Sequence, residues 1–439
     1  MASSHLLLAP MRWFAALLIY RFLLPLLFLT AFPGWIVKML RRGGFGTRLG
    51  ERAAIYSTES EFEPHGAVHI HAVSVGEALL ALKLIREWSF QEPERRFVLA
   101  TGTAAGHQVA ASAAITNVRV TYATLDFRFM VRRYLNRFEP EQIVLIEGEA
   151  WPHLLLTCRR CGIPVSLVNA RMSPRSARRY RKFATWLRPL FGMLDAVAIQ
   201  ETEDAEIWRE LGVPMERIHH TGSLKFDPAG GARPVRRPEF QEMLDAFGEN
   251  RRVILAASTH TGEDAWITAS ILNAAPDALP VIVPRHAERR DEVKTELERA
   301  GFDVVLRSQF HVPAATGDRR HVFVIDSTGE LRDWTAHADV VIIGKSFLAT
   351  GGQNPGEAII AEKPVIFGPH MENFQPLADH LVAANGCIRA LDENALCEAI
   401  ITALDPSKAE TLTRNAARIL QRHEGATKRI ITLLTAPVN

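Results

Sequence analysis

The sequence predicts an α/β protein whose two domains, each a doubly wound parallel sheet, face a cleft, with a membrane-anchor helix before them. Three observations lead to this prediction. The chain has 439 residues, more than the size at which a single hydrophobic core stops growing. From residue 64 onward, short β-branched runs alternate with helical periodicity, as in sheets built from βαβ units. The alternation stops once, in a segment rich in proline, glycine and arginine, and then resumes.

The two halves contain matching sets of predicted strands. The expected strands are residues 68–71, 97–101, 118–122, 143–146, 164–168 and 196–199 in the first half, and 253–257, 281–283, 304–306, 322–325, 340–343 and 365–367 in the second. The predicted organisation is an anchor with a basic juxtamembrane segment (1–40), a first domain (41–227), a linker (228–238) and a second domain (239–439).

Composition excludes several classes of protein. Hydrophobic residues make up 47% and charged residues 23% of the chain, and the formal net charge of +2 argues against a dedicated nucleic-acid binder. Four cysteines are too few for the disulfide framework of a secreted domain. Cys158 and Cys161 form a CxxC pair that no second pair or nearby histidine completes as a zinc site, so we expect a structural role.

The first strong feature is an apolar stretch over residues 13–36. It is long enough for a bilayer, which needs about 20 residues, but the central Arg21 costs about 2.5 to 3.5 kcal/mol on insertion scales. Basic residues suited to anionic headgroups on the cytoplasmic side follow it, namely Lys38, Arg41, Arg42, Arg48 and Arg52. A monotopic anchor that contacts membrane lipids is favoured, and a full span is the alternative.

The loops that follow predicted strands are where ligands of parallel sheets bind. The first is HAVSVGE, in which Ser74 and Glu77 have the spacing of a helix capping box. On spacing alone the cap is the favoured interpretation, and the alternative is that Glu77 serves as a general base.

Further charged residues follow later strands of the first half. Glu147 and Glu149 come directly after a buried strand, where a helix dipole or a substrate would each account for them. The basic run that contains Arg171 and Arg175 is either a solvated helix face or a site for lipid phosphates. Lys225 is either a hinge lysine or an anion ligand.

In the second half, polar loops at successive strand ends indicate a nucleotide site. Arg285 and His286 follow one strand, and the glycine-containing loops 326–331 and 351–358 follow others. Backbone N–H groups in such loops bind phosphate, and Glu357 is suited to ribose hydroxyls. The sequence has neither a P-loop nor a GxSxG or HExxH motif.

Together these loops resemble those of the Kdo transferases, which add 3-deoxy-D-manno-octulosonic acid (Kdo) to lipid A precursor. The resemblance covers nearly the whole chain and rests on HAVSVGE, EGEAWP, VNARMSPRSARRY, TGSLKFD, ASTHTGE, VPRH, STGEL, GGQNPGEA and GPHMENF, in the family's order. It implies a GT-B fold of two Rossmann-like domains, with the acceptor in the first and CMP-Kdo in the second. The second domain would hold CMP through Pro284, Arg285, Thr328, Gly329, Glu330, Asn354, Pro355, Gly356 and Glu357.

The resemblance also assigns roles in the first domain. It makes Glu77 the proton acceptor, which overrides the preference from spacing, and one glutamate of the Glu147/Glu149 pair a second catalytic carboxylate. Ser74, Arg171, Arg175 and Lys225 are expected to contact the acceptor.

The implied protein is an inverting glycosyltransferase that moves Kdo from CMP-Kdo to lipid A precursor (lipid IVA) in lipopolysaccharide biosynthesis. It would work at the cytoplasmic face of the cell inner membrane, without metal, cofactor or nucleic acid. Lys345, Thr350, Gln353, Gly356 and the segment 100–106 depart from the family's pattern. The alternatives are a GT-B transferase with another CMP- or UDP-sugar and a non-catalytic paralogue that binds lipid or nucleotide; retention of Glu77 argues against the latter.

Overall fold

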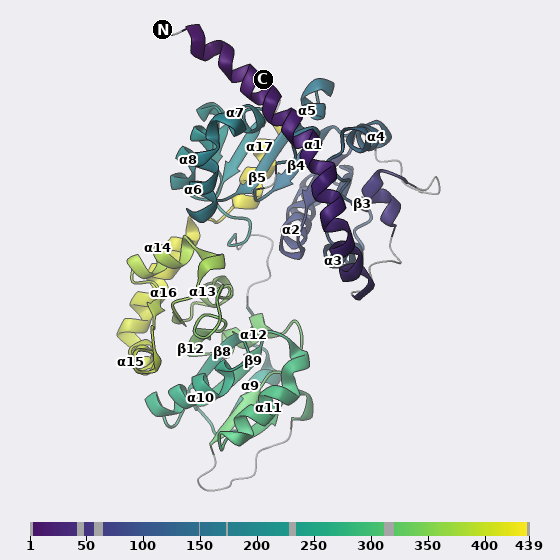
Figure 1. The fold of residues 1–439 in the computed structure, drawn as a ribbon. Helices are drawn as coiled ribbons and strands as arrows, with labels where there is room; N and C mark the ends of the chain where they lie inside the picture. Colours follow the sequence, from purple (N-terminus) through teal and green to yellow (C-terminus); the bar gives the residue numbers. More distant parts are fainter. Residues whose placement is uncertain are drawn as a thin grey trace. The chain divides into compact units, whose positions relative to one another are not determined.

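The computed structural model describes residues 3–41, 48–56, 65–148, 150–172, 174–227, 234–310 and 320–436. The chain divides into two compact units (Figure 1). Unit 1 consists of Met1–Gly230 together with His423–Asn439, and unit 2 is Gly231–Arg422. Each unit contains one seven-stranded parallel sheet, so the predicted pair of doubly wound sheets is confirmed.

The sheet of unit 1 has the order β3-β2-β1-β4-β5-β6-β7. Its strands are β1 (Val68–Ala72), β2 (Phe97–Thr101), β3 (Val118–Tyr122), β4 (Gln142–Ile146), β5 (Val165–Ala170), β6 (Ala196–Ile199) and β7 (Ile218–His220). The first six match the predicted strands. The edge strand β7 was not predicted, because its sequence, IHH, has no apolar run to mark it.

Helices flank this sheet. They are α1 (Ser3–Arg41), α2 (Val75–Gln91), α3 (Ala104–Ser112), α4 (Arg128–Phe138), α5 (Pro152–Cys161), α6 (Pro174–Lys182), α7 (Ala184–Phe191), α8 (Ala205–Glu210) and α17 (Ala426–Thr435). Strands such as β1 and β4 are buried along their whole length, as expected for a parallel sheet covered on both faces.

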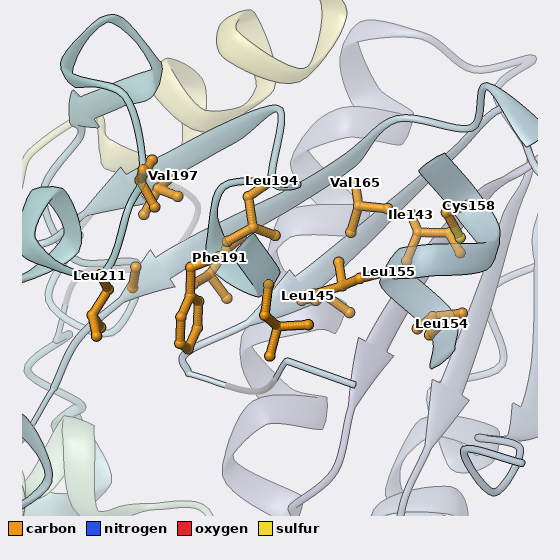
Figure 2. Close-up of a cluster of buried hydrophobic side chains, with 14 of the residues drawn as sticks. Ile143, Leu145, Leu154, Leu155, Cys158, Val165, Phe191, Leu194, Val197 and Leu211 are labelled. Carbon is orange, nitrogen blue, oxygen red and sulfur yellow. The ribbon is translucent and has the colours of Figure 1, made fainter. Parts of the chain in front are cut away.

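Two apolar clusters fill the space between this sheet and its helices. One, shown in part in Figure 2, joins Leu145 of β4 to Leu154 and Cys158 of α5 and to Phe191 of α7. The other joins β1 and β2 to α2 and α17. Cys158 is buried and Cys161 is exposed, and both are free thiols, in agreement with a structural role for Cys158.

The sheet of unit 2 has the order β10-β11-β9-β8-β12-β13-β14. Its strands are β8 (Val253–Thr259), β9 (Leu279–Pro284), β10 (Asp303–Leu306), β11 (His321–Val324), β12 (Val340–Ile343), β13 (Val365–Phe367) and β14 (Ile388–Arg389). All six predicted strands are present, and the two-residue β14 is the addition. The helices are α9 (Pro238–Asp245), α10 (Glu263–Ala274), α11 (Arg290–Arg299), α12 (Leu331–His337), α13 (Gly356–Ile360), α14 (Leu377–Ala383), α15 (Glu393–Leu404) and α16 (Pro406–Gln421).

The last helix returns to unit 1. The predicted second domain, 239–439, included it, but α17 packs against α2 and buries Ile430 and Ile431 in the core of unit 1. The Asp227 carboxylate fixes its start by accepting hydrogen bonds from the backbone N–H groups of Gly425 (3.0 Å) and Thr427 (2.7 Å). A sequence pattern does not reveal this exchange, because the contact joins residues about 200 positions apart.

Replacing Asp227 with asparagine is expected to lower the free energy of unfolding by about 2 kcal/mol, because a buried acceptor of two helix N–H groups loses its charge and one oxygen. Urea denaturation of full-length protein measures the change. Asp245→Asn, an exposed aspartate of α9, is the control and should change it by less than about 0.5 kcal/mol. Equal effects of the two substitutions would contradict the capping role.

Helix α1 lies along unit 1 beside α7 (Figure 1). Leu17 is buried and Tyr20, Leu24 and Phe28 are half-buried; their spacing of three or four residues places them on one face of the helix. Most of the other described side chains between Leu18 and Phe32 are apolar and exposed, for example Phe22 at 78%. By length and composition, the segment Ala16–Gly34 would reach across a membrane.

Candidate active site

The order of the strands in unit 1 reverses between β1 and β4. In open parallel sheets, such a switch point opens a crevice at the carboxyl ends of the strands, and ligands bind there. Glu77 follows β1, Glu147 follows β4 and Arg171 follows β5. The structure therefore brings predicted residues from separate motifs to one edge of the sheet.

Glu77 closes the capping box at the start of α2. The Ser74 hydroxyl oxygen accepts a hydrogen bond from the Glu77 N–H (3.2 Å). In return, the Glu77 carboxylate accepts from the Val73 N–H (2.7 Å) and the Ser74 hydroxyl (2.8 Å). A carboxylate has about four lone-pair sites, so an oriented Glu77 that caps the helix still has sites to accept a proton. The capping interpretation and the base are compatible.

The loop before α2 is held by a close approach of the chain after β2. A Cβ atom added at Gly102 would lie 2.5 Å from a Val73 side-chain atom and 2.8 Å from the Val73 backbone. No side chain fits there without moving the loop, because real Cβ contacts are longer. Gly102, within the segment that departs from the family's pattern, therefore helps to fix the position of Glu77.

Glu147, Arg171 and Lys225 form a charged cluster beside Glu77. The Arg171 Nε lies 3.7 Å from the Glu147 carboxylate. Burial raises the pKa of Glu147. Arg171 and Lys225 counteract this rise, and the Glu77 carboxylate adds to it. Burial lowers the pKa of Lys225 to about 8. Arg171 also lowers this pKa, and Glu147 raises it. These mutual effects show that the four side chains share one electrostatic environment.

The backbone at Glu147 adopts a strained conformation. Its φ of 67° lies in the left-handed region, which is unfavourable for residues other than glycine. Hydrogen bonds on both sides maintain it: the Glu147 N–H donates to the Val168 carbonyl (3.0 Å), and its own carbonyl accepts from the Arg171 N–H (3.2 Å).

Two predicted residues of unit 1 cannot be placed in this cluster. Glu149 and the side chain of Arg175 lie outside the described residues. The helix that contains Arg175, α6, is predominantly basic, and Arg178 and Arg179 are exposed. Arg181 of the same helix pairs with Glu210 at 2.5 Å.

In unit 2 the strand order reverses between β8 and β12, and the predicted nucleotide loops follow β9, β11 and β12. The Arg285 N–H donates to the Thr259 carbonyl (3.0 Å), which joins the loops after β9 and β8, and the Arg285 side chain is exposed. Burial raises the pKa of Glu357, while Arg332 and Arg285 oppose the rise. Arg285 and Glu357 are therefore electrostatic neighbours.

The other predicted donor residues occupy two turns at the same edge. Gly329, with a φ of 86°, and Thr328 are exposed ahead of α12, beside Glu330, whose carboxylate accepts from the Trp334 indole N–H (3.4 Å) and Arg307 (3.3 Å). The Asn354 side-chain oxygen accepts from the Gly356 N–H (3.0 Å). Pro284, the last residue of β9, and Pro355, directly before α13, are buried.

Glu263 is an organising residue of unit 2 that the sequence did not single out. Its fully buried carboxylate accepts hydrogen bonds from the N–H groups of His260 (3.0 Å) and Lys345 (2.6 Å), and of Phe347 and Leu348 (3.2 and 3.4 Å). It ties the loop after β12 to the loop after β8. Its position in the THTGE motif was visible in the sequence, but an acid at a helix start is usually explained by the helix dipole.

Comparison with known proteins gives a consistent result. A family model described as 3-deoxy-D-manno-octulosonic-acid transferase (kdotransferase) matches residues 47–228. The 3-deoxy-D-manno-octulosonic acid transferase of Bordetella pertussis is 36% identical over 386 residues, which cover 84% of this chain and 86% of that protein. The Haemophilus influenzae enzyme of the same name is 31% identical over 392 residues, covering 88% of this chain and 90% of that protein.

Among solved structures, the chain is similar in fold to the UDP-GlcNAc 2-epimerase of Neisseria meningitidis bound to UDP-GlcNAc. The TM-score is 0.55 and the identity 14%, over 84% of this chain and 100% of that one. This likeness concerns the fold alone and, with the two sheets described above, confirms the predicted GT-B fold.

Proposed function

Because this chain belongs to the 3-deoxy-D-manno-octulosonic acid transferases, and is therefore a glycosyltransferase, we propose that it moves Kdo from CMP-Kdo to lipid A precursor (lipid IVA), with Glu77 as the base. The observation that carries the proposal is the convergence of Glu77, Glu147, Arg171 and Lys225 at the switch point of the first sheet. Two carboxylates and two cations suit an acceptor that presents both a hydroxyl group and phosphates.

The proposed reaction is a direct displacement. Glu77 takes the proton of a glucosamine hydroxyl while that oxygen forms a bond to the anomeric carbon of Kdo. The bond from this carbon to the phosphate oxygen of CMP breaks on the opposite face, CMP leaves with the electron pair, and the configuration inverts. The hydrogen bonds from Val73 and Ser74 orient the Glu77 carboxylate. Such orientation suits a general base, because a base must lie within hydrogen-bond distance of the proton that it removes.

The second unit would hold the donor. Arg285 is exposed at the end of β9, where a guanidinium group can stabilise the charge that grows on the departing phosphate. Glu357, whose charge is balanced by Arg332 and Arg285, is suited to accept hydrogen bonds from the ribose hydroxyls. Glycines and small polar residues in the turns around Thr328 and Asn354 let backbone groups approach the nucleotide.

We propose that the protein works at the cytoplasmic face of the inner membrane, to which its first helix would attach it. One face of α1, from Leu17 to Phe28, packs on unit 1, so this stretch cannot be surrounded by lipid. Its other faces expose Phe22, Leu26 and Leu29. A helix that is covered by protein on one side and apolar on the other fits a monotopic anchor better than a span.

Acceptor binding is expected to weaken as the pH rises through about 8, the pKa to which burial lowers Lys225. Below that pH the ammonium group is charged and attracts acceptor phosphate; above it the neutral amine does not, so the acceptor KM increases by up to about tenfold per pH unit. The rise starts at this pKa of the free protein and levels off only near the higher pKa of the complex, because bound phosphate favours the charged form.

The acceptor KM, measured from about pH 6.5 to about pH 9.5, provides the test. Lys225→Arg keeps its charge throughout this range and should remove the rise. The same rise in native protein and in the variant would show that another group causes it.

Donor selectivity tests the proposed function as a whole. Purified protein in detergent is offered CMP-Kdo generated in situ, and separately a UDP-sugar, with tetraacylated lipid A precursor as the acceptor. The proposal expects transfer from CMP-Kdo alone. Transfer from the UDP-sugar alone would assign a different donor, and binding of CMP without transfer would indicate a non-catalytic relative.

A further inference from the structure

The membrane-anchor helix is hydrogen-bonded to the loop that supports the catalytic cluster. The hydroxyl group of Tyr20, in the middle of α1, donates to the Asp126 carboxylate (2.8 Å). The same carboxylate accepts from the backbone N–H groups of His153 and Leu154, each at 2.9 Å. These two N–H groups belong to the first turn of α5, which begins directly after the loop that carries Glu147.

Asp126 supplies the cap that α5 does not obtain from its own N-cap residue. Within the described residues, the N-cap residue Trp151 gives no side-chain hydrogen bond to the helix, although the first N–H groups of a helix need acceptors when they are buried. Asp126 lies 27 positions before His153, just ahead of α4, and is buried. The start of α5 is therefore fixed by a distant carboxylate rather than by the local sequence.

Ring contacts also join α1 to the start of α5 and to Phe127, which follows Asp126. The Tyr20 ring lies 5.2 Å from the His153 ring, and the Phe28 ring lies 5.8 Å, edge-on, from that of Phe127. The His153 ring also donates from Nδ1 to the Asp126 backbone carbonyl. Tyr20 and Phe28 of α1 therefore contact Asp126 and Phe127, and Asp126 in turn caps the first turn of α5.

We propose that Tyr20 and Asp126 are positioning residues, which join the membrane anchor to the Glu147-bearing loop and hold that loop in its catalytic geometry. Because Glu147 is fixed on one side by β5 and Arg171, the start of α5 is the other end of the loop. A loop with one end released shifts its side chains, and small displacements of catalytic groups reduce turnover strongly. This inference rests on the proposed function, in which the cluster acts on the acceptor.

The test uses Tyr20→Phe, which removes one hydroxyl and leaves the apolar helix intact, and Asp126→Asn. We expect kcat to fall about tenfold in the first and about a hundredfold in the second, with the KM for CMP-Kdo unchanged because unit 2 is untouched. Membrane association should also be unchanged. In Tyr20→Phe, the backbone amides of His153 and Leu154 should exchange their hydrogens about tenfold faster than in native protein.

Tyr56→Phe is the matched control, because within the described residues the buried Tyr56 hydroxyl has no hydrogen-bond partner. It should leave kcat and exchange at the start of α5 unchanged. The proposal is overturned if Tyr20→Phe keeps native kcat and native exchange, or if Tyr56→Phe loses as much activity. If native protein transfers no Kdo, the proposed function fails, whereas hydrogen exchange still shows whether the anchor fixes the start of α5.

Discussion

Replacing Glu77 with glutamine is expected to lower the rate of Kdo transfer by a factor of about 10² to 10⁴, the range typical for loss of a general base. Glutamine keeps the size of the side chain and one oxygen that can accept from Val73 or Ser74, so α2 should still begin at the same place. The acceptor hydroxyl, however, keeps its proton during attack. A steady-state assay at saturating donor and acceptor measures the change.

The double role of Glu77 makes a stability control necessary. Loss of half of the capping box costs about 1 kcal/mol, and such a loss alone leaves the protein folded. Asp392→Ala removes an exposed N-cap of α15, where the aspartate accepts from the Ala395 N–H (2.9 Å), and should cost a similar amount without lowering transfer. If Glu77→Gln retains more than about a tenth of native activity, Glu77 is a helix cap and another group is the base.

The largest effect on stability is expected from Glu263→Gln, at about 4 kcal/mol lost from the free energy of unfolding. The carboxylate is fully buried and accepts from four backbone N–H groups. An amide turns an NH₂ group toward donors that need an acceptor, so at least one pair of N–H groups loses its partner. Because Glu263 joins the loops after β8 and β12, CMP binding should weaken as well.

Urea denaturation and titration with CMP measure the two consequences for Glu263→Gln. Glu292→Gln is the control: Glu292 is exposed and pairs with Arg289 at 2.9 Å, and exposed pairs contribute about 1 kcal/mol or less. Similar midpoints for the two variants would mean that the loop after β12 is held by other contacts.

The sequence predicted the strands well because parallel strands buried on both faces are short, continuous apolar runs. Val253–Thr259 and Val340–Ile343 are of this kind. The strands β7 and β14 are short edge strands, and their sequences carry no comparable signal. Motif order then predicted which residues lie after each strand, and strand order places Glu77 and Glu147 on either side of the switch point.

The sequence could not predict contacts between distant segments. The Asp227 cap of α17, the Asp126 cap of α5 and its hydrogen bond from Tyr20 each join residues that no periodicity relates. Local pattern was also ambiguous at Glu77, because a capping box and a base require the same residue at the same position. The structure shows the cap directly, and a carboxylate that caps the helix still has lone pairs that can accept a proton.

The most direct test of the proposed function is an assay for transfer of labelled Kdo from CMP-Kdo, generated in situ, to tetraacylated lipid A precursor. Native protein and Glu77→Gln are assayed in parallel, and the lipid is analysed by mass spectrometry. We expect a lipid product enlarged by whole Kdo residues, release of CMP, and loss of this product in the variant. Native protein that binds CMP but leaves the lipid unchanged, or a variant as active as the native protein, would contradict the proposal.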